Sequence, residues 1–429
     1  AASVTHAPCV FAAAPRSRGF ALKTPLMLSF SSVTRSFRYR LRPSRAQVLV
    51  LLEWLRLARE LYNAALQERR DAWAKQRVNV SRIDQEKQLP AVRAERPEFL
   101  AVPIAVQRGA LRRLDRAFAA FFRRCKAGEA PGYPRFKAAR RWNSLLIDDL
   151  GKSIGVVAGG KRVAIPLLGK VRLHIADDRP LRGVPKAMRI VYDLGKWYVT
   201  FACVDVPTKP LPATGTSVGV DLGLLTFAAT SDGEMFANPR PLRAARIAVE
   251  RAQRRVSRRR RGSKRRRRAT QALVRRHAHV AGIRREHHIT VARSLVTRHD
   301  TIYVEDLNVK GLAAGMLAKS VHDAAWSTFG HWLACKAEDA GRRVVKVDPR
   351  GTSQSCSSCG CVSEKHLSLD VRMLRCAACG LALDRDVNAA INIKGLGLAP
   401  QGAAPPVRGR RRSAKLPRSG DRVTAENPF

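Results

Sequence analysis

Three short stretches of this chain each carry an acidic side chain at the end of a run that is typical of a buried β-strand. They are residues 217–223 with Asp221, residues 301–307 with Glu305, and residues 383–388 with Asp386. An ionised carboxylate at the end of an apolar strand is unfavourable unless a positive group meets it. In a strongly basic chain the candidates are an arginine or a bound metal ion. We therefore expect a fold that brings these three acids together.

The charge balance restricts the partners that the chain can bind. Its 80 Lys and Arg residues face only 34 Asp and Glu residues, which gives a net charge of +46 over 429 residues. Such an excess repels itself in a compact state and is neutralised most simply by nucleic acid. An anionic membrane surface is the alternative, but the sequence contains no apolar run of about eighteen residues. Residues 250–276, where arginine stands at almost every second position, favour a helix or helical hairpin lying along phosphates.

Two Cys-x-x-Cys-Gly knuckles predict a metal site. Cys356 and Cys359 form the first knuckle, Cys376 and Cys379 form the second, and sixteen residues separate them. Each knuckle presents two thiolates, which can occupy two of the four corners of a tetrahedron, so the pattern predicts one structural zinc ion in a zinc ribbon. Close cysteine pairs of this kind also favour a reducing compartment over disulfides. Cys361 lies just outside the first knuckle and is expected to remain a free thiol.

The N-terminal part predicts a helical domain set into a β-rich one. Ser44 and Gln47 form a capping box before a helix of about 28 residues, and a second helix is expected over residues 104–126. Short β-rich runs at 36–41 and between 131 and 210 predict a small β-barrel that the helices interrupt. The expected buried stripe of the second helix comprises Leu111, Leu114, Phe118, Phe121, Phe122 and Cys125.

The two ends of the chain lie outside this pattern. Residues 1–34 are rich in Ala, Ser and Arg and contain no acid. We interpret them as a disordered, non-native or upstream-translated extension, with a transit peptide as the alternative. Residues 397–429 are rich in Pro, Gly and Arg and are expected to be disordered alone.

The C-terminal part predicts a second domain from about residue 214, with a single amphipathic helix from Val321 to Ala340 and a helix that begins near Asp386. Each acid also has a simpler interpretation. Asp221 could be a hairpin-turn acid, Glu305 a salt-bridge partner of one of the many arginines, and Asp386 an acid at a helix N-terminus.

The order of these motifs resembles the transposon-encoded TnpB (OrfB) proteins, which are relatives of the type V CRISPR effectors. The resemblance covers about residues 35–395. It rests on Gly-Val-Asp221-Leu-Gly, Val-Glu305-Asp-Leu-Asn-Val-Lys-Gly311, Thr352-Ser-Gln-Ser-Cys356-Ser-Ser-Cys359-Gly and Asp384-Arg-Asp386-Val-Asn-Ala-Ala.

This resemblance implies a multidomain α/β protein in which an RNase H-like (RuvC) nuclease domain contains an inserted zinc ribbon. A small β-barrel wedge domain is interrupted by a helical recognition domain. The corresponding ranges are 35–44 and 131–210 for the wedge, 45–130 for the recognition domain, 214–350 and 381–396 for the nuclease domain, and 351–380 for the ribbon.

The resemblance also implies an activity, namely metal-dependent cleavage of DNA guided by an RNA that the transposon encodes. Asp221, Glu305 and Asp386 would be the catalytic acids and would hold two Mg²⁺ ions, as hard carboxylate oxygens can. The expected setting is the prokaryotic cytoplasm, in association with the nucleoid. A nuclease-inactive RNA-guided DNA-binding regulator and a compact type V CRISPR effector are the alternatives, and the sequence leaves the oligomeric state open.

Overall fold

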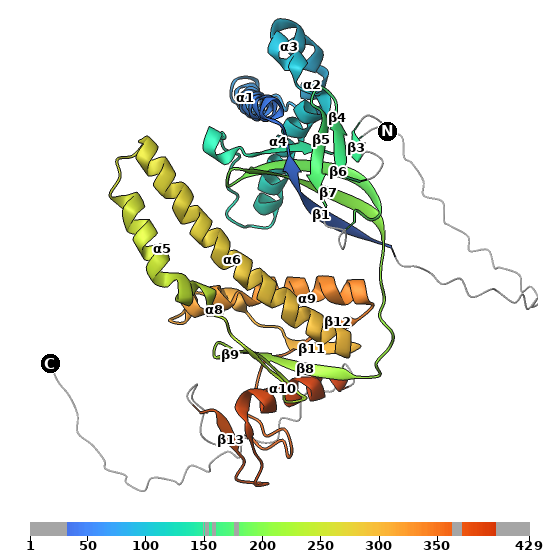
Figure 1. Ribbon diagram of the computed structural model, residues 1–429, viewed down its shortest axis with the longest axis vertical. Helices are drawn as coiled ribbons and strands as arrows, with labels where there is room; N and C mark the ends of the chain where they lie inside the picture. The colour runs from blue at the N-terminus through green and yellow to red at the C-terminus, as the bar shows by residue number, and fades with distance from the viewer. Residues whose placement is uncertain are drawn as a thin grey trace, which may run out of the picture.

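The computed structural model describes residues 32–148, 150, 154–156, 160–175, 180–362 and 371–399. An N-terminal half contains one sheet with a group of helices, and a C-terminal half contains a second sheet with its own helices and a small cysteine-rich unit (Figure 1). The first strand begins at Ser32 and the last helix ends at Leu398, so both run slightly past the boundaries expected from sequence. Most of the expected extension and tail lies outside the described residues.

The N-terminal half is built on a seven-stranded antiparallel sheet in the order β2-β6-β7-β1-β5-β4-β3. Its strands are β1 (Ser32–Arg42), β2 (Ser144–Ile147), β3 (Gly155–Val156), β4 (Arg162–Ile165), β5 (Gly169–His174), β6 (Val184–Asp193) and β7 (Lys196–Pro207). The first strand of the chain therefore lies in the middle of the sheet, between β7 and β5.

Where the sequence predicts a small β-barrel, the described strands form an open sheet. Among the described residues the edge strands β2 and β3 pair with β6 and β4 but not with each other, so this sheet is open. One physical reason lies at β2, where a helix packs very closely. A Cβ atom on Gly109 would stand 1.9 Å from the carbonyl oxygen of Leu146, so only glycine permits this contact.

The helices of the N-terminal half share one apolar core with the sheet. They are α1 (Arg45–Gln76), α2 (Arg82–Lys87), α3 (Leu89–Glu95) and α4 (Ile104–Lys126), with 3₁₀ turns η1 (Pro97–Ala101) and η2 (Ala139–Arg141). The capping box of Ser44 and Gln47 is confirmed, as are the bounds of α4. The expected buried stripe of α4 is correct only as far as Leu114, since Phe122 and Cys125 near its end are exposed.

The C-terminal half contains a five-stranded mixed sheet in the order β10-β9-β8-β11-β12. Its strands are β8 (Ser217–Leu222), β9 (Thr226–Thr230), β10 (Met235–Ala237), β11 (Thr301–Glu305) and β12 (Arg343–Val347). The first three run antiparallel to one another, whereas β11 is parallel to both β8 and β12. The remaining helices are α5 (Pro241–Ser257), α6 (Lys264–Arg298), α7 (Val309–Leu312), α8 (Ala318–Ala324), α9 (Trp326–Ala340) and α10 (Arg385–Leu398).

Helices cover both faces of this second sheet (Figure 1). Val218, Val220 and Ile302 point to one face, where they share a core with residues of α6 and α9 such as Leu295 and Phe329. Side chains of a strand alternate between faces, so Gly219 and Asp221 point to the other face. That face is covered by α10.

The single helix expected from Val321 to Ala340 is broken. Ala325 adopts a left-handed conformation with φ of 51° and separates α8 from α9. Distant contacts fix the end of α8, just before the break. The buried carboxylate of Asp323 accepts hydrogen bonds from the backbone amides of Leu242 and Arg243 and so caps the start of α5, and it also pairs with Arg284 at 2.9 Å.

The two halves contact each other through β1 and α9. The guanidinium of Arg35 in β1 lies 2.8 Å from the carboxylate of Glu338 and 3.4 Å from that of Asp339. The backbone amides of Lys209 and Leu211, which follow β7, donate to the carbonyl oxygens of Asp339 and Ala340. Of the helices within the described ranges, none is both long and apolar enough to cross a membrane.

Candidate carboxylate site and cysteine cluster

Strand register places Asp221 and Glu305 side by side. Val220 of β8 is the parallel partner of Val304 in β11, and the next residue on each strand is the acid. Adjacent strands lie about 4.8 Å apart, and residues in register point to the same face. The two carboxylates therefore lie next to each other at the C-terminal ends of these strands.

Helix α10 brings Asp386 to the same place. A Cβ atom on Gly219 would stand 2.0 Å from the carbonyl oxygen of Ala390, so glycine lets α10 lie directly on β8. The carboxylate of Asp384 caps α10 by accepting from the backbone amides of Asp386 and Val387, which leaves Asp386 in the first turn. A Cβ on Gly223, just past the end of β8, would be 3.9 Å from Oδ2 of Asp386.

The pKa values report how these three acids affect one another. Burial and the nearby charges of Glu305 and Asp386 raise the pKa of Asp221 to about 8. Burial also raises the pKa of Glu305 and the pKa of Asp386. Like charges held together in a partly buried place favour protonation unless a cation neutralises them. The arrangement is thus suited to binding divalent cations.

The simpler interpretations of the acids fit these contacts unequally. Asp221 lies within strand β8 and not in the following turn. Neither Asp221 nor Glu305 forms an ion pair with a residue in the described ranges. Asp386 does fit the interpretation of a helix N-terminal acid, and its Oδ2 also lies 3.5 Å from Nη1 of Arg372. Sequence reasoning gave Arg372 no part in this site.

Thr352 is a second residue of the site that sequence reasoning gave no role. Its buried hydroxyl lies 2.6 Å from Oε1 of Glu305 and donates to it, which opposes the rise in the pKa of that carboxyl. The Asn392 side chain on α10 donates to the backbone carbonyl of Thr352. Asn388 donates to the backbone carbonyl of Ser355 and accepts from the backbone amide of Ser357. The spacing of the two asparagines, four residues apart on one helix face, is a signal in the sequence for this side of α10, but not for Thr352.

The four cysteines of the two knuckles converge. Their sulfur atoms all lie within 4.8 Å of one another, with 3.6 Å between Cys356 and Cys379 and 3.5 Å between Cys359 and Cys376. Tetrahedral zinc–thiolate bonds of about 2.3 Å require sulfur separations of roughly 3.8 Å, so the geometry fits. Strands β13 (Met373–Arg375) and β14 (Ala382–Asp384) pair beside the second knuckle. Cys361 is exposed and stays outside the cluster, as expected.

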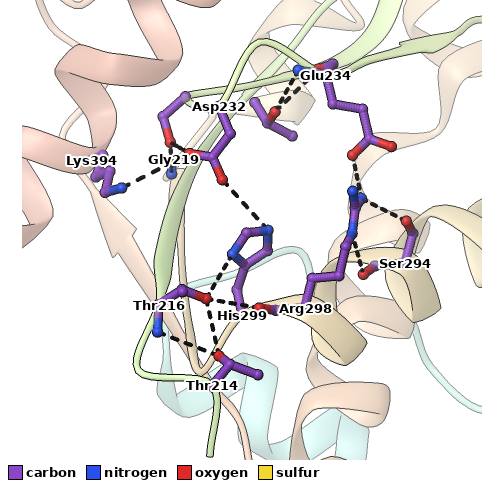
Figure 2. Close-up of polar contacts among 11 residues, drawn as sticks. Thr214, Thr216, Gly219, Asp232, Glu234, Ser294, Arg298, His299 and Lys394 are labelled. Atoms are coloured by element: carbon purple, nitrogen blue, oxygen red, sulfur yellow. Dashed lines mark hydrogen bonds and ion pairs between the residues drawn. The ribbon is translucent and has the colours of Figure 1, made fainter.

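A polar cluster secures the opposite end of β8 (Figure 2). The side chain of Asp232, in the β9–β10 turn, lies 3.8 Å from the ring of His299 and 3.9 Å from the ammonium of Lys394 on α10. Nδ1 of His299 lies 3.2 Å from the hydroxyl of Thr216, just before β8. Burial lowers the pKa of His299, which favours the neutral ring. Because Lys394 belongs to α10, this cluster helps to hold the helix that carries Asp386.

Three known families match parts of the chain. Residues 326–393 match the "Cas12f1-like, TNB domain", residues 201–315 match a family described as "Probable transposase", and residues 27–77 match a "Helix-turn-helix domain". The described part of the last range forms one strand and one helix, β1 and α1, so it does not contain two helices joined by a turn.

Curated relatives match most of the chain. A "Putative RNA-guided DNA endonuclease" of Streptomyces pristinaespiralis is 33% identical over 392 residues, which covers 90% of this chain and 95% of that protein. A protein of the same description from Escherichia coli is 28% identical and covers 67% of this chain and 73% of its own length. Among solved structures, a Cas12f1–sgRNA–target DNA complex matches with 14% identity and a TM-score of 0.34, covering 85% of this chain and 100% of that chain.

Proposed function

The chain belongs to the family of TnpB-like RNA-guided DNA endonucleases, and on that basis we propose that it cuts DNA with a catalytic site formed by Asp221, Glu305 and Asp386. The observation that carries this proposal is the position of the three carboxylates, two on neighbouring parallel strands and one at the start of the helix packed against them. Their raised pKa values are typical of carboxylates in a cation-binding site.

The topology of the second sheet supports an RNase H-like nuclease domain. Three antiparallel strands lead into two parallel ones, with helices on both faces, and the acids lie at the C-terminal ends of β8 and β11. In this interpretation the seven-stranded sheet of the N-terminal half is the wedge domain. The helices α1 to α4 are then the recognition domain.

The residues present fit a pair of Mg²⁺ ions. Magnesium prefers carboxylate oxygens, and the three acids offer six of them. Two arginines lie near enough to affect these acids: Arg372 pairs with Asp386, and the charge of Arg385 lowers the pKa of Asp221 and of Asp386. Asp221, whose pKa responds to both other acids, would be shared by the two ions, with Glu305 and Asp386 holding one each. Such ions, when bound by these acids, would supply an activated water and stabilise the departing oxygen. Thr352 keeps Glu305 in place through its hydrogen bond.

The cysteine cluster fits one zinc ion with a structural role. All four tetrahedral positions would be filled by thiolates, so no position remains for a water or a substrate. The knuckle is connected to the carboxylate site, because Asn388 and Asn392 of α10 both contact the backbone that leads from Thr352 to Ser357. We assign zinc the task of fixing this connection.

The partners that follow are an RNA guide, supplied by the transposon, and a DNA target. Sequence choice would then depend mainly on base pairing with the guide, while the protein holds the backbone. The net charge of +46 suits a protein that binds many phosphates at once.

The experiment that tests this function is cleavage of a matched DNA by the protein with its copurifying RNA. We expect Asp221→Ala, Glu305→Ala and Asp386→Ala each to abolish Mg²⁺-dependent cleavage, since each removes ligands that the remaining two cannot replace. RNA binding should be retained in all three. Cleavage by Asp221→Ala at the wild-type rate would reject the assignment, and a wild-type protein that binds but never cuts would favour the nuclease-inactive regulator.

A further inference from the structure

Two asparagines on one face of α10 contact the segment that joins the carboxylate site to the cysteine cluster. Asn388 is buried, and Asn392, one helical turn further along, is partly buried. The side chain of Asn388 donates to the carbonyl oxygen of Ser355 and accepts from the backbone amide of Ser357, both at 2.8 Å. Ser357 lies inside the first knuckle, directly after its first cysteine. Asn388 therefore holds the end of the segment that carries the cysteines.

Asn392 contacts the other end of the same segment. Its side-chain amide donates to the carbonyl oxygens of Thr352 and Ser355, both at 2.8 Å. The hydroxyl of buried Thr352 in turn lies 2.6 Å from Oε1 of Glu305 and donates to it. Two successive side-chain contacts thus join α10 to the acid at the end of β11, without passing through the sheet.

Helix α10 also carries a second acid of the site. Asp386 lies in its first turn, six residues before Asn392, or about 9 Å along the axis at 1.5 Å per residue. The helix rests on β8 where Gly219 lets its backbone approach, and that contact sets its height above the sheet. The contacts of Asn392 tie the same helix to Thr352, and through it to Glu305. A shift of α10 that moved Asp386 away from Glu305 would therefore stretch these hydrogen bonds.

We propose that Asn392 is a positioning residue of the nuclease site proposed above. Through Thr352 it fixes Glu305 relative to Asp386, and the fixed spacing gives the site a preference for Mg²⁺ over the larger Ca²⁺. Mg²⁺ requires near-ideal octahedral geometry with oxygens at about 2.0–2.1 Å, whereas Ca²⁺ accepts flexible arrangements of oxygens at about 2.3–2.6 Å. Acids held in one arrangement exclude the ion that needs more space. Acids that move freely adapt to either ion, so a looser site loses the distinction.

The different contacts of the two asparagines separate this role from support of the knuckle. Asn392 contacts the backbone of Thr352, whereas Asn388 contacts the backbone of Ser355 and Ser357. Loss of the Asn388 amide should therefore affect the cysteine cluster first, and loss of the Asn392 amide should affect the acids first. Groups that orient the ligands of a metal typically contribute about 10- to 100-fold to metal affinity, so the effect is large enough to measure.

The test uses variants of the full-length protein, loaded with its copurifying RNA and free of DNA. Asn392→Leu removes the amide with little change in side-chain shape, and Asn388→Leu is its matched partner. Thr352→Val removes the hydroxyl that contacts Glu305 and leaves Asn392 in place. Gly395→Ala is the control on α10, because its new Cβ meets nothing within 4 Å.

The measured quantity is the concentration of Mg²⁺, or of Ca²⁺, that gives half-maximal protection from hydrogen exchange in the first turn of α10. This measurement reports on the surroundings of Asp386 and not on ions bound by the RNA, and it requires no cleavage. The ratio of the two concentrations, Ca²⁺ over Mg²⁺, gives the preference of each variant for Mg²⁺. A general loss of stability raises both concentrations alike and leaves their ratio unchanged. Asp221→Ala serves as the blank, since it lacks one of the three acids.

For Asn392→Leu we expect the Mg²⁺ concentration to rise on the order of 10-fold and the Ca²⁺ concentration to rise less, so that the ratio falls. Thr352→Val should lower the ratio as well. The double variant should lose no more than the more affected single variant, because both changes interrupt the same path. Gly395→Ala should keep the wild-type ratio. Asn388→Leu should lose zinc, measured by elemental analysis, with a ratio nearer to the wild-type value.

A wild-type ratio in Asn392→Leu or in Thr352→Val would overturn the proposal, as would additive losses in the double variant or an equal fall of the ratio in Asn388→Leu. Melting temperature and zinc content show whether Asn392→Leu is folded, and if it is not, the ratio of Thr352→Val decides. Failure of the nuclease site itself has a different signature. The wild-type protein would then gain no protection from either ion, or Asp221→Ala would be protected as well as the wild-type protein, and both proposals would fail together.

Discussion

Replacing Gly219 by alanine should move α10 and with it Asp386. The added Cβ would stand 2.0 Å from the carbonyl oxygen of Ala390 and 2.7 Å from the amide nitrogen of Lys394. Ordinary contact begins at 3.4 Å, so the helix must retreat by up to about 1.4 Å, the difference between 3.4 and 2.0 Å. Both obstacles are backbone atoms that cannot rotate away. Overpacking of this kind costs about 1–3 kcal/mol of unfolding free energy, or more.

The displacement should also affect catalysis, since a misplacement of about 1 Å can cost on the order of 100-fold in rate. We would measure the rate of DNA cleavage together with hydrogen exchange of the α10 amides. Gly219→Ala should show slow cleavage and faster exchange in α10. Wild-type values for both would refute the view that Gly219 sets the distance between α10 and β8.

Two matched glycine variants separate stability from site geometry. Gly330→Ala lies on the exposed side of α9, where the new Cβ meets nothing within 4 Å, and it should stabilise by about 0.5–1 kcal/mol. Gly109→Ala creates a similar clash at 1.9 Å, but against Leu146 in the N-terminal half. It should destabilise the protein without altering exchange in α10. If Gly109→Ala slowed cleavage as much as Gly219→Ala at a temperature where both are folded, loss of stability alone would explain the effect.

Three further predictions concern the site. Thr352→Val removes the hydrogen bond to Glu305, so the pKa of that carboxyl should rise. The acidic limb of the pH profile of cleavage should then shift to higher pH. Thr352→Ser keeps the hydroxyl and should keep the wild-type profile. Cys379→Ser should lose the bound zinc and lower the melting temperature, whereas Cys361→Ser should retain one zinc per chain by elemental analysis. Without added divalent metal, the pKa of Asp221 in the folded protein is about 8, above its unfolded value of about 3.9. The neutral form of Asp221 therefore stabilises the folded protein fully below pH 4, and this stabilisation is lost as the pH rises through 8. The free energy of unfolding should fall by at most about 1.4 kcal/mol per pH unit. Asp221→Asn should flatten this part of the curve in thermal unfolding, and an unchanged slope would contradict the raised pKa.

Local signals in the sequence were sufficient for much of the fold. The capping box of Ser44 and Gln47 marks the start of α1, and the apolar spacing after Pro103 gives the bounds of α4. The knuckle spacing identified four cysteines that the structure brings together. The placement of Asp221 and Glu305 could be anticipated as well, because parallel strands end at one edge of a sheet. Their catalytic role remains a prediction.

What the sequence did not reveal depends on contacts between distant residues. The break at Ala325 lies two residues after Asp323, whose carboxylate caps α5 some 80 residues away, and helical periodicity contains no sign of either. The open sheet depends on the close approach of α4 to β2, which Gly109 permits. Thr352 escaped notice because a lone threonine has no periodic pattern, and its importance comes only from the 2.6 Å contact with Glu305.

The central position of β1 has a consequence for synthesis on the ribosome. The 153 residues between Arg42 and Lys196 must be made before β7, the longest partner of β1, even begins. At about 5–20 residues per second, this leaves the strand without that partner for roughly 8–30 s. Helices α1 to α4 emerge during that interval, and they share a core with Tyr39 and Leu41 of β1. They are thus placed to cover the apolar face of the nascent strand until the rest of its sheet arrives.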